Sequence, residues 1–347
     1  MKMARWVSLG VLSLSSSALG LAACSATPPA EDPLMADPPV TSASTAPATS
    51  SKNPDLVKGE LLLQAGKPGE ALPLFKAVLT ADPKSAEAAF YMAVATEQTQ
   101  GDPKEVERLY KQAITFDPKL VDAALNLGAI YLAEPARPDE AIAMLDKALA
   151  HSPGDPKLLI NLGYAYSLKK EHAKAVKALQ GALPNEDTSE VRLMLGMALF
   201  DGGKQKEAVP HLLKAASTMK DDAPTLATVA RMVAFGEAFE DCVKLLDRAI
   251  KLKGDDPEWY VRRGTCKHEL GKEKEAGEDF QAAIKLEPKF QAAHYYLAMS
   301  LLAQGRGTDG RLELKKTWEL GKDTKLGKLA KDKLEGKAPK KPDAPKK

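Results

Sequence analysis

The sequence predicts an all-α chain built from tandem helix pairs, and two observations carry this prediction. Hydrophobic residues make up 44% of the chain but aromatic residues only 5%, and Ala and Leu dominate the apolar share, which favours closely packed helices over sheet. One pattern of small and large apolar residues also returns at a nearly constant spacing. At 347 residues the chain is long enough for two ordinary domains, but the repeat favours one extended array.

The charge balance gives no general reason to expect nucleic-acid binding. The formal net charge is +2, with 28% charged residues of both signs. A nucleic-acid-binding chain usually carries a strong basic excess that neutralises phosphates. We therefore look to proteins and membranes as partners.

The amino terminus carries the pattern of an export signal. Lys2 and Arg5 precede an uncharged, largely apolar stretch, residues 6–23, which leads into Leu21-Ala22-Ala23-Cys24. This segment resembles a bacterial lipoprotein signal, whose lipobox is Leu, two small residues and Cys. The resemblance implies cleavage of residues 1–23 and lipidation of Cys24, whose several acyl chains hold a protein at a bilayer.

Two other interpretations of this segment compete with the lipoprotein signal. A secretory signal with an accidental Cys is one, and an uncleaved membrane-spanning anchor is the other. The stretch is short and rich in Ser and Gly, which argues against a span. Ser25 follows the cysteine, and in Gram-negative lipoproteins a residue other than Asp there is typical of export to the outer membrane. We expect a lipoprotein of the cell envelope that faces the periplasm.

Residues 24–51 consist mainly of Pro, Ala, Ser and Thr, with few charges and no apolar period. Such a composition cannot bury enough apolar surface to fold. We expect a disordered tether between the lipid anchor and the folded part of the chain.

The repeat follows one frame: a small residue, then a large apolar residue four positions later, then a small residue and a polar or proline stop. The stops fall at 83, 118, 153, 186, 220, 254, 288 and 322, so their spacing stays between 33 and 35 residues. The frame reads Ala71-Phe75-Val78, Val106-Tyr110-Ala113, Ala141-Leu145-Ala148, Ala175-Leu179-Ala182, Ala208-Leu212-Ala215, Cys242-Leu246-Ala249 and Ala276-Phe280-Ala283.

Another frame precedes each copy of this one, with a large apolar residue, an apolar residue, Gly or Ala, and a large residue. Because it comes first in each repeat, we call it the first-helix frame, and we call the frame described above the second-helix frame. Its copies are Ala124-Leu127-Gly128-Tyr131, Leu159-Leu162-Gly163-Tyr166, Arg192-Leu195-Gly196-Leu199, Leu226-Val229-Ala230-Val233 and Tyr260-Arg263-Gly264-Lys267. Positions three and four apart share one helix face, so each frame marks one helix with an apolar stripe.

Together the two frames resemble the tetratricopeptide repeat (TPR), with its W-x2-L-G-x2-Y, A-x3-F and P signature. The resemblance covers residues 52–322 as eight repeats and implies a right-handed α-solenoid of about eight helix-turn-helix units. Some residues depart from the family. Arg263 and Lys267 replace apolar residues in the seventh repeat, and the second helix of the last repeat reads Gly310-Leu314-Thr317.

Glycine in the middle of the first helices costs about 1 kcal/mol relative to Ala. It occurs at 128, 163, 196 and 264. A helix tolerates that cost where the missing side chain allows a neighbouring helix to approach. We expect each glycine to contact the second helix of its own repeat, at the Ala that opens the second-helix frame.

The carboxyl-terminal end is basic. Leu326, Leu329 and Leu334 mark an amphipathic helix over residues 323–336, which we expect to cap the open end of the array. Residues 337–347 contain mainly Lys, Pro, Ala and Asp and are expected to be disordered. A solubilising role is favoured over contact with an anionic surface.

The cysteines of the repeats leave two possibilities open. Cys242 occupies a small-residue position and Cys266 lies in the next helix, so the two side chains could be neighbours. An exported location permits a disulfide if the geometry allows it. From the sequence we favour two packed thiols over a bridge.

No pattern of residues indicates catalysis. The five histidines show no H-E-x-x-H spacing, and nucleophile-elbow, P-loop and dinucleotide motifs are missing from the sequence. The acid pairs Asp221-Asp222 and Asp255-Asp256 fall between repeats, where helix starts explain them. We expect no enzyme activity, no metal and no cofactor.

The resemblance to TPR proteins implies a concave groove lined by the first helices. Carried over by position, the groove residues of repeats two to five are apolar and partly aromatic, and Phe200 extends them. An amphipathic helix or an extended apolar peptide fits such a groove, although the same residues could pack between helices instead. The predicted groove residues are Phe90, Val94, Leu125, Ala129, Ile160, Tyr164, Leu193, Met197 and Phe200, and further along Ala227, Arg231, Val261, Thr265, Tyr295 and Met299.

Some TPR proteins grip a terminal carboxylate with Lys and Asn. Asn126, Asn161 and Lys157 match positions of that clamp, but Phe90 and Val94 occupy positions where it needs Lys and Asn. We therefore do not expect a carboxylate clamp.

The sequence thus predicts a lipid-anchored scaffold that binds other proteins or peptide segments or assembles an envelope complex. A narrower version is a lipoprotein that assists pilus or secretin assembly, by likeness of architecture alone. The alternatives are an envelope enzyme or small-ligand-binding protein, and a structural spacer.

Overall fold

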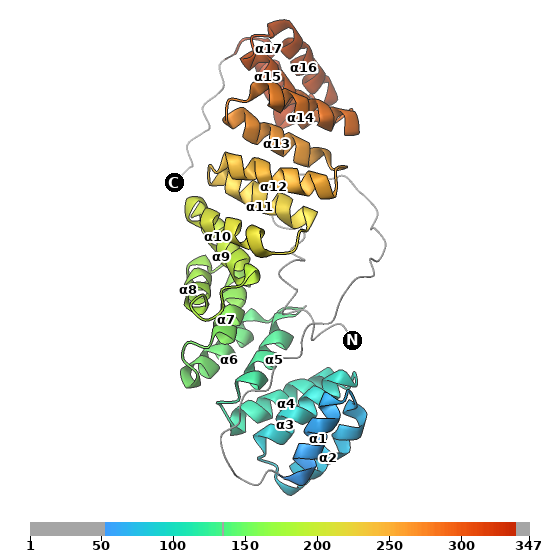
Figure 1. Cartoon of the computed structure of the whole chain (residues 1–347), viewed down its shortest axis with the longest axis vertical. Coiled ribbons are helices and arrows are strands. Elements are labelled where there is room, and N and C mark those ends of the chain that lie inside the picture. Colours follow the sequence, from blue (N-terminus) through green and yellow to red (C-terminus); the bar gives the residue numbers. More distant parts are fainter. Residues whose placement is uncertain (1–52, 134, 338–347) are drawn as a thin grey trace. The chain divides into compact units, whose positions relative to one another are not determined.

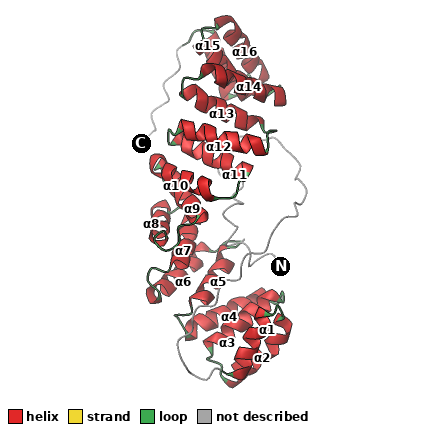
Figure 2. Cartoon of the chain, viewed as in Figure 1, coloured by secondary structure: helices red, strands yellow, loops and turns green. Residues whose placement is uncertain are grey.

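The computed structural model describes residues 53–133 and 135–337, and all regular secondary structure in these ranges is helical (Figure 2). The predicted lipoprotein signal, Cys24, the tether and nearly all of the basic tail lie outside the described residues. The predicted all-α fold is confirmed.

The described residues form seventeen helices, of which the first sixteen make eight consecutive helix-turn-helix pairs (Figure 1). The pairs are α1(Pro54–Gln64) with α2(Pro68–Ala81), α3(Ala86–Gln98) with α4(Pro103–Phe116), α5(Val121–Leu132) with α6(Pro138–His151), α7(Pro156–Leu168) with α8(His172–Ala182), α9(Ser189–Asp201) with α10(Gln205–Thr218), α11(Ala223–Phe235) with α12(Phe239–Leu252), α13(Pro257–Glu269) with α14(Glu273–Leu286), and α15(Gln291–Ala303) with α16(Gly307–Leu320). The last helix is α17(Lys325–Leu334).

The helices belong to two compact units, divided after Pro153. The first unit holds α1–α6 and the second holds α7–α17. Within each unit a helix packs on its partner in the pair and on the next helix of the chain.

The residues of the second-helix frame form the core of each unit. In α8, for example, Ala175, Leu179 and Ala182 are fully buried, because they recur three and four residues apart on one helix face.

Several of the first helices begin at an Asp that caps them. Asp155 accepts hydrogen bonds from the amides of Lys157 and Leu158, which satisfies donors that have no partner inside the helix.

The mid-helix glycines lie against the second helix of their own repeat, as predicted. A Cβ added to Gly163 would lie 2.5 Å from Cγ of Leu179, the large residue of the second-helix frame. The same relationship joins Gly196 to Leu212 at 2.6 Å.

The two charged residues of the seventh repeat find a buried counterion. Asp279 on α14 is 4% exposed. Its carboxylate accepts hydrogen bonds from Nη2 of Arg263 at 2.6 Å and forms an ion pair with Nζ of Lys267 at 2.9 Å. Both cations lie on α13, so an ion-pair cluster joins the helices of this repeat at positions where the fourth repeat has Leu162 and Tyr166.

Cys242 on α12 and Cys266 on α13 form a disulfide, so the expectation of two separate thiols is wrong. Their Cα atoms lie 6.5 Å apart, within the range that a disulfide spans. The sequence could not show this, because it depends on how the sixth repeat packs on the seventh.

The last repeat closes as predicted. Gly310, Leu314 and Thr317 of α16 are buried, and Ala330 of α17 packs in one core cluster with Leu314. On the neighbouring helix the buried ring of His294 lies 2.6 Å from a carboxylate oxygen of Glu313 on α16. The end of the array is therefore held by apolar and polar contacts together.

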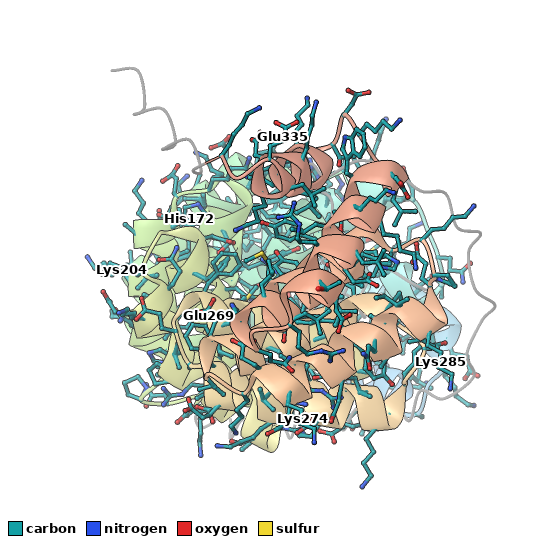
Figure 3. The ribbon with its side chains drawn as sticks, turned by 90° about the horizontal axis from the view of Figure 1, so that it is seen from above. His172, Lys204, Glu269, Lys274, Lys285 and Glu335 are labelled. Atoms are coloured by element: carbon teal, nitrogen blue, oxygen red, sulfur yellow. A yellow bond between two sulfur atoms is a disulfide. The ribbon has the colours of Figure 1, made fainter. Side chains whose placement is uncertain are left out.

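Several lysine side chains of the second unit lie at its periphery. In Figure 3, Lys204, Lys274 and Lys285 extend outward from the helices, and all three residues are exposed. The polar faces of the second helices thus meet solvent, while their apolar faces build the core.

Candidate protein-interaction surface

Three of the larger predicted groove residues lie in the first unit. Phe90 and Val94 are on α3 and Leu125 is on α5, and all three are half-buried. The Phe90 ring packs edge-on against Tyr91 with centroids 5.1 Å apart, and its centroid lies 6.1 Å from that of Tyr110. These side chains therefore serve the packing of the unit and still retain some exposed surface.

The other predicted groove residues of repeats four and five lie in the second unit. Ile160 and Tyr164 on α7, and Met197 and Phe200 on α9, are half-buried. Leu193 on α9 differs, because it is only 6% exposed and belongs to the core. Its side chain offers a partner almost no surface, while the other four residues retain some.

Phe200 has an aromatic neighbour that is not among the predicted groove residues. Phe235 ends α11 and is 63% exposed. Its ring meets the Phe200 ring edge-on with centroids 5.7 Å apart. The guanidinium of Arg231, one helical turn before Phe235, lies 5.6 Å from the Phe200 centroid. The aromatic signal was present in the sequence, but its exposure depends on the packing of α9 and α11.

The two asparagines at clamp-type positions are engaged within the protein. The side-chain amide of Asn126 donates to the Tyr110 hydroxyl at 3.1 Å, and this hydroxyl donates to Glu97 at 3.0 Å. The side-chain amide of Asn161, which is 7% exposed, donates to the Lys157 carbonyl. Burial raises the pKa of Glu97, and the hydrogen bond from Tyr110 opposes that rise. The network around Tyr110 joins α3, α4 and α5.

The carboxylate of Glu107 is paired with two cations, which lower its pKa strongly. Hydrogen bonds from Arg137 and Lys111 lower the pKa of Glu107 to about 2. The Arg137 guanidinium also lies over the Tyr131 ring, 4.5 Å from its centroid. A carboxylate this acidic is a poor general base near neutral pH. The cluster instead ties α4 to α5 and to the start of α6.

The second residue of each acid pair between repeats caps a helix, in line with the predicted location at helix starts. Asp222 accepts from the amide of Thr225, and Asp256 from the amide of Glu258. Burial raises the pKa of Asp256.

Within residues 53–133 and 135–337, no group of His, Cys, Asp and Glu side chains has a geometry suited to a metal ion. In the same ranges no helix combines the length and apolar character that crossing a membrane requires.

Comparison with protein families identifies the repeats. Models described as tetratricopeptide repeat match residues 56–121 and 275–316, residues 132–198, and residues 258–290. Together these matches cover more than half of the chain. No curated protein sequence matches it significantly.

Solved structures with similar folds share little sequence with this chain. YrrB, described as a TPR protein with an unusual peptide-binding site, has 20% identity and a TM-score of 0.37, over 64% of this chain and 97% of its own. PilF of Pseudomonas aeruginosa has 22% identity and a TM-score of 0.49, over 59% of this chain and 93% of its own. A TPR protein of Thermus thermophilus has 24% identity and a TM-score of 0.38, over 52% of this chain and 97% of its own.

Proposed function

Because the chain is a tetratricopeptide-repeat protein, we propose that it is a lipid-anchored scaffold of the cell envelope that binds other proteins through its first helices. The observation that carries the proposal is the set of apolar side chains that remain partly exposed on these helices. In the second unit they are Ile160, Tyr164, Met197 and Phe200, with Phe235 beside Phe200. Aromatic side chains that stay partly exposed on a folded surface are typical anchors for a protein partner.

Two features support a location in the envelope. The sequence Leu21-Ala22-Ala23-Cys24 follows an apolar stretch, as in lipoprotein signals. The disulfide between Cys242 and Cys266 is typical of proteins that fold in an oxidising compartment such as the periplasm.

Capture of partners from solubilised membranes tests the binding surface. We expect the double variant Tyr164→Glu, Phe200→Glu to lose partners that the wild type retains, because two carboxylates would need desolvation at the interface. The matched control is Gln180→Glu, Gln281→Glu, which adds the same charge at exposed positions of second helices. If the double variant kept every partner of the wild type, the first helices would not be the binding surface.

Cell fractionation tests the anchor. We expect Cys24→Ala to move the protein from the membrane fraction to the soluble fraction, while Ser25→Ala leaves it with the membrane. Density-gradient separation of the two membranes tests the outer-membrane location. Unchanged membrane association of Cys24→Ala would contradict a lipid anchor at this residue.

A further inference from the structure

Arg231 differs from the comparable arginines of the second unit. Four others in this unit are half-buried, and each forms an ion pair with an Asp or Glu. They are Arg192 with Asp187, Arg248 with Asp221, Arg262 with Glu258, and Arg263 with Asp279 and Asp247. Arg231 is also half-buried, but among the described residues it has neither a hydrogen bond nor an ion pair.

The surroundings of Arg231 leave its charge uncompensated by direct contact. Burial lowers the pKa of Arg231 and the nearby charge of Arg262 lowers it further, whereas Asp201 and Glu258 act in the opposite direction. Glu258 is already paired with Arg262, and Asp201 is exposed at the end of α9. A guanidinium carries five donors in a planar fork, so Arg231 can bind a carboxylate through two hydrogen bonds.

The apolar surface beside this cation is aromatic. The Phe200 ring faces the guanidinium, and the exposed Phe235 ring packs edge-on against the Phe200 ring. Burying Phe235 under a ligand would remove apolar area from water, which drives binding. Arg and aromatic residues are also the side chains most enriched among those that dominate binding energy in interfaces.

We propose that Phe200, Arg231 and Phe235 form a recognition site for a peptide segment of another protein in which an Asp or Glu lies next to a large apolar side chain. The ligand carboxylate pairs with Arg231, and the neighbouring apolar side chain packs on Phe235 and Phe200. Charge complementarity selects this partner over a purely apolar peptide, because a peptide carboxylate gives the half-buried guanidinium of Arg231 a counterion and an apolar side chain does not. The inference rests on the proposed function and narrows the class of its partner.

An array of short synthetic peptides tests the site with the full-length protein. The array holds peptides in which Glu or Asp alternates with Phe, Leu or Met, and a second set in which Gln or Asn replaces the acids. We expect the acidic set to bind at least about tenfold more tightly than the amide set, as for charge-assisted hydrogen bonds. Equal binding of the two sets would overturn the proposal.

Variants assign the binding to the named residues. We expect Arg231→Gln to weaken binding of the acidic set about tenfold or more and to leave the weak binding of the amide set unchanged. Arg231→Lys should fall between wild type and Arg231→Gln, because Lys keeps the charge but cannot bind a carboxylate in a fork. Phe235→Ser should weaken both sets. Circular dichroism confirms that each variant keeps its helices.

Two further measurements distinguish a specific site for a separate partner from a general charge effect and from occupation by this chain. Arg306→Gln removes an exposed charge elsewhere in the second unit and should leave binding unchanged; an equal loss would mean that only net charge matters. The chain itself contains the acidic and apolar segment Glu31-Asp32-Pro33-Leu34-Met35-Ala36-Asp37. If only a peptide copying residues 29–40 bound, the occupant would be this chain, and the proposal of a separate partner would be overturned.

The proposed function can fail independently of this site. If the wild type captured membrane partners that Tyr164→Glu, Phe200→Glu released, but Arg231→Gln bound the array as the wild type does, only the present inference would be wrong. If the wild type captured no partner at all, the proposed function would be wrong as well.

Discussion

The guanidinium of Arg263 donates two hydrogen bonds to the carboxylate of Asp279 in a bidentate arrangement, from Nη2 to Oδ1 at 2.6 Å and from Nε to Oδ2 at 3.0 Å. This pair replaces an apolar contact between the helices of the seventh repeat. Ion pairs in such positions are expensive to break, because one charge then remains buried without a partner.

We expect Asp279→Asn to lower the free energy of unfolding by about 3 kcal/mol, the low end for a broken buried ion pair. Arg263 and Lys267 lose their shared buried counterion, but Arg263 keeps the exposed Asp247 and Lys267 keeps Glu275 at 4.0 Å. The triple variant Arg263→Leu, Lys267→Tyr, Asp279→Leu should restore the stability or exceed it, because it provides the apolar residues that other repeats use. Urea denaturation followed by circular dichroism measures both variants. An unchanged midpoint for Asp279→Asn would show that the ion pair contributes nothing.

Gly163 lets α7 and α8 approach, so a methyl group at this position should be costly. We expect Gly163→Ala to lower the free energy of unfolding by about 1–3 kcal/mol, because its Cβ would overlap the Leu179 side chain. Gly181→Ala on α8 is the matched control. There the new Cβ would meet only the two terminal methyl groups of Leu159, at 3.3 and 3.9 Å, and the higher helix propensity of Ala offsets the contact. Thermal unfolding measures the midpoints of both variants. Equal midpoints for Gly163→Ala and Gly181→Ala would contradict the close packing of Gly163 against Leu179.

The disulfide between Cys242 and Cys266 closes a loop with a sequence separation of 24 residues. We expect its reduction to lower the free energy of unfolding by roughly 2–4 kcal/mol, through the greater freedom of the unfolded chain. Thermal unfolding with and without dithiothreitol measures the effect. The double variant Cys242→Ala, Cys266→Ala should be insensitive to the reductant. Free-thiol labelling of the denatured, unreduced protein that detected both cysteines would disprove the bond.

His211 should make the second unit less stable in mild acid. Its Nδ1 lies 2.9 Å from Nη1 of Arg192, so the neutral ring accepts a hydrogen bond from the guanidinium. Burial lowers the pKa of His211, the charge of Arg192 lowers it further, and Asp187 opposes them. The unfolded chain then binds the proton more readily than the folded one, and stability falls as the pH drops below the ordinary value of 6.5.

We expect His211→Gln to reduce this loss of stability between about pH 7 and pH 5, which denaturation midpoints across that range would reveal. His151→Gln, at an exposed position of α6, is the control and should keep the wild-type slope. If His211→Gln and the wild type had the same slope, protonation of this ring would play no part in acid sensitivity.

The sequence alone determined the repeat, its register and the helical fold. These features depend on residues three and four positions apart, which any helix places on one face whatever surrounds it. Ala175, Leu179 and Ala182 were therefore recognisable as core residues from their spacing. The capping role of Asp222 and Asp256 was also predictable, because a cap satisfies amides only two or three residues away.

The tertiary structure alone decided which residues meet across helices. It joined Gly163 to Leu179, gave Arg263 and Lys267 a buried counterion, and bonded Cys242 to Cys266. In the candidate site it placed Leu193 in the core and left Phe235 exposed beside Phe200 and Arg231. Each of these outcomes depends on the distance and rotation between neighbouring helices, which the periodicity within one helix does not contain.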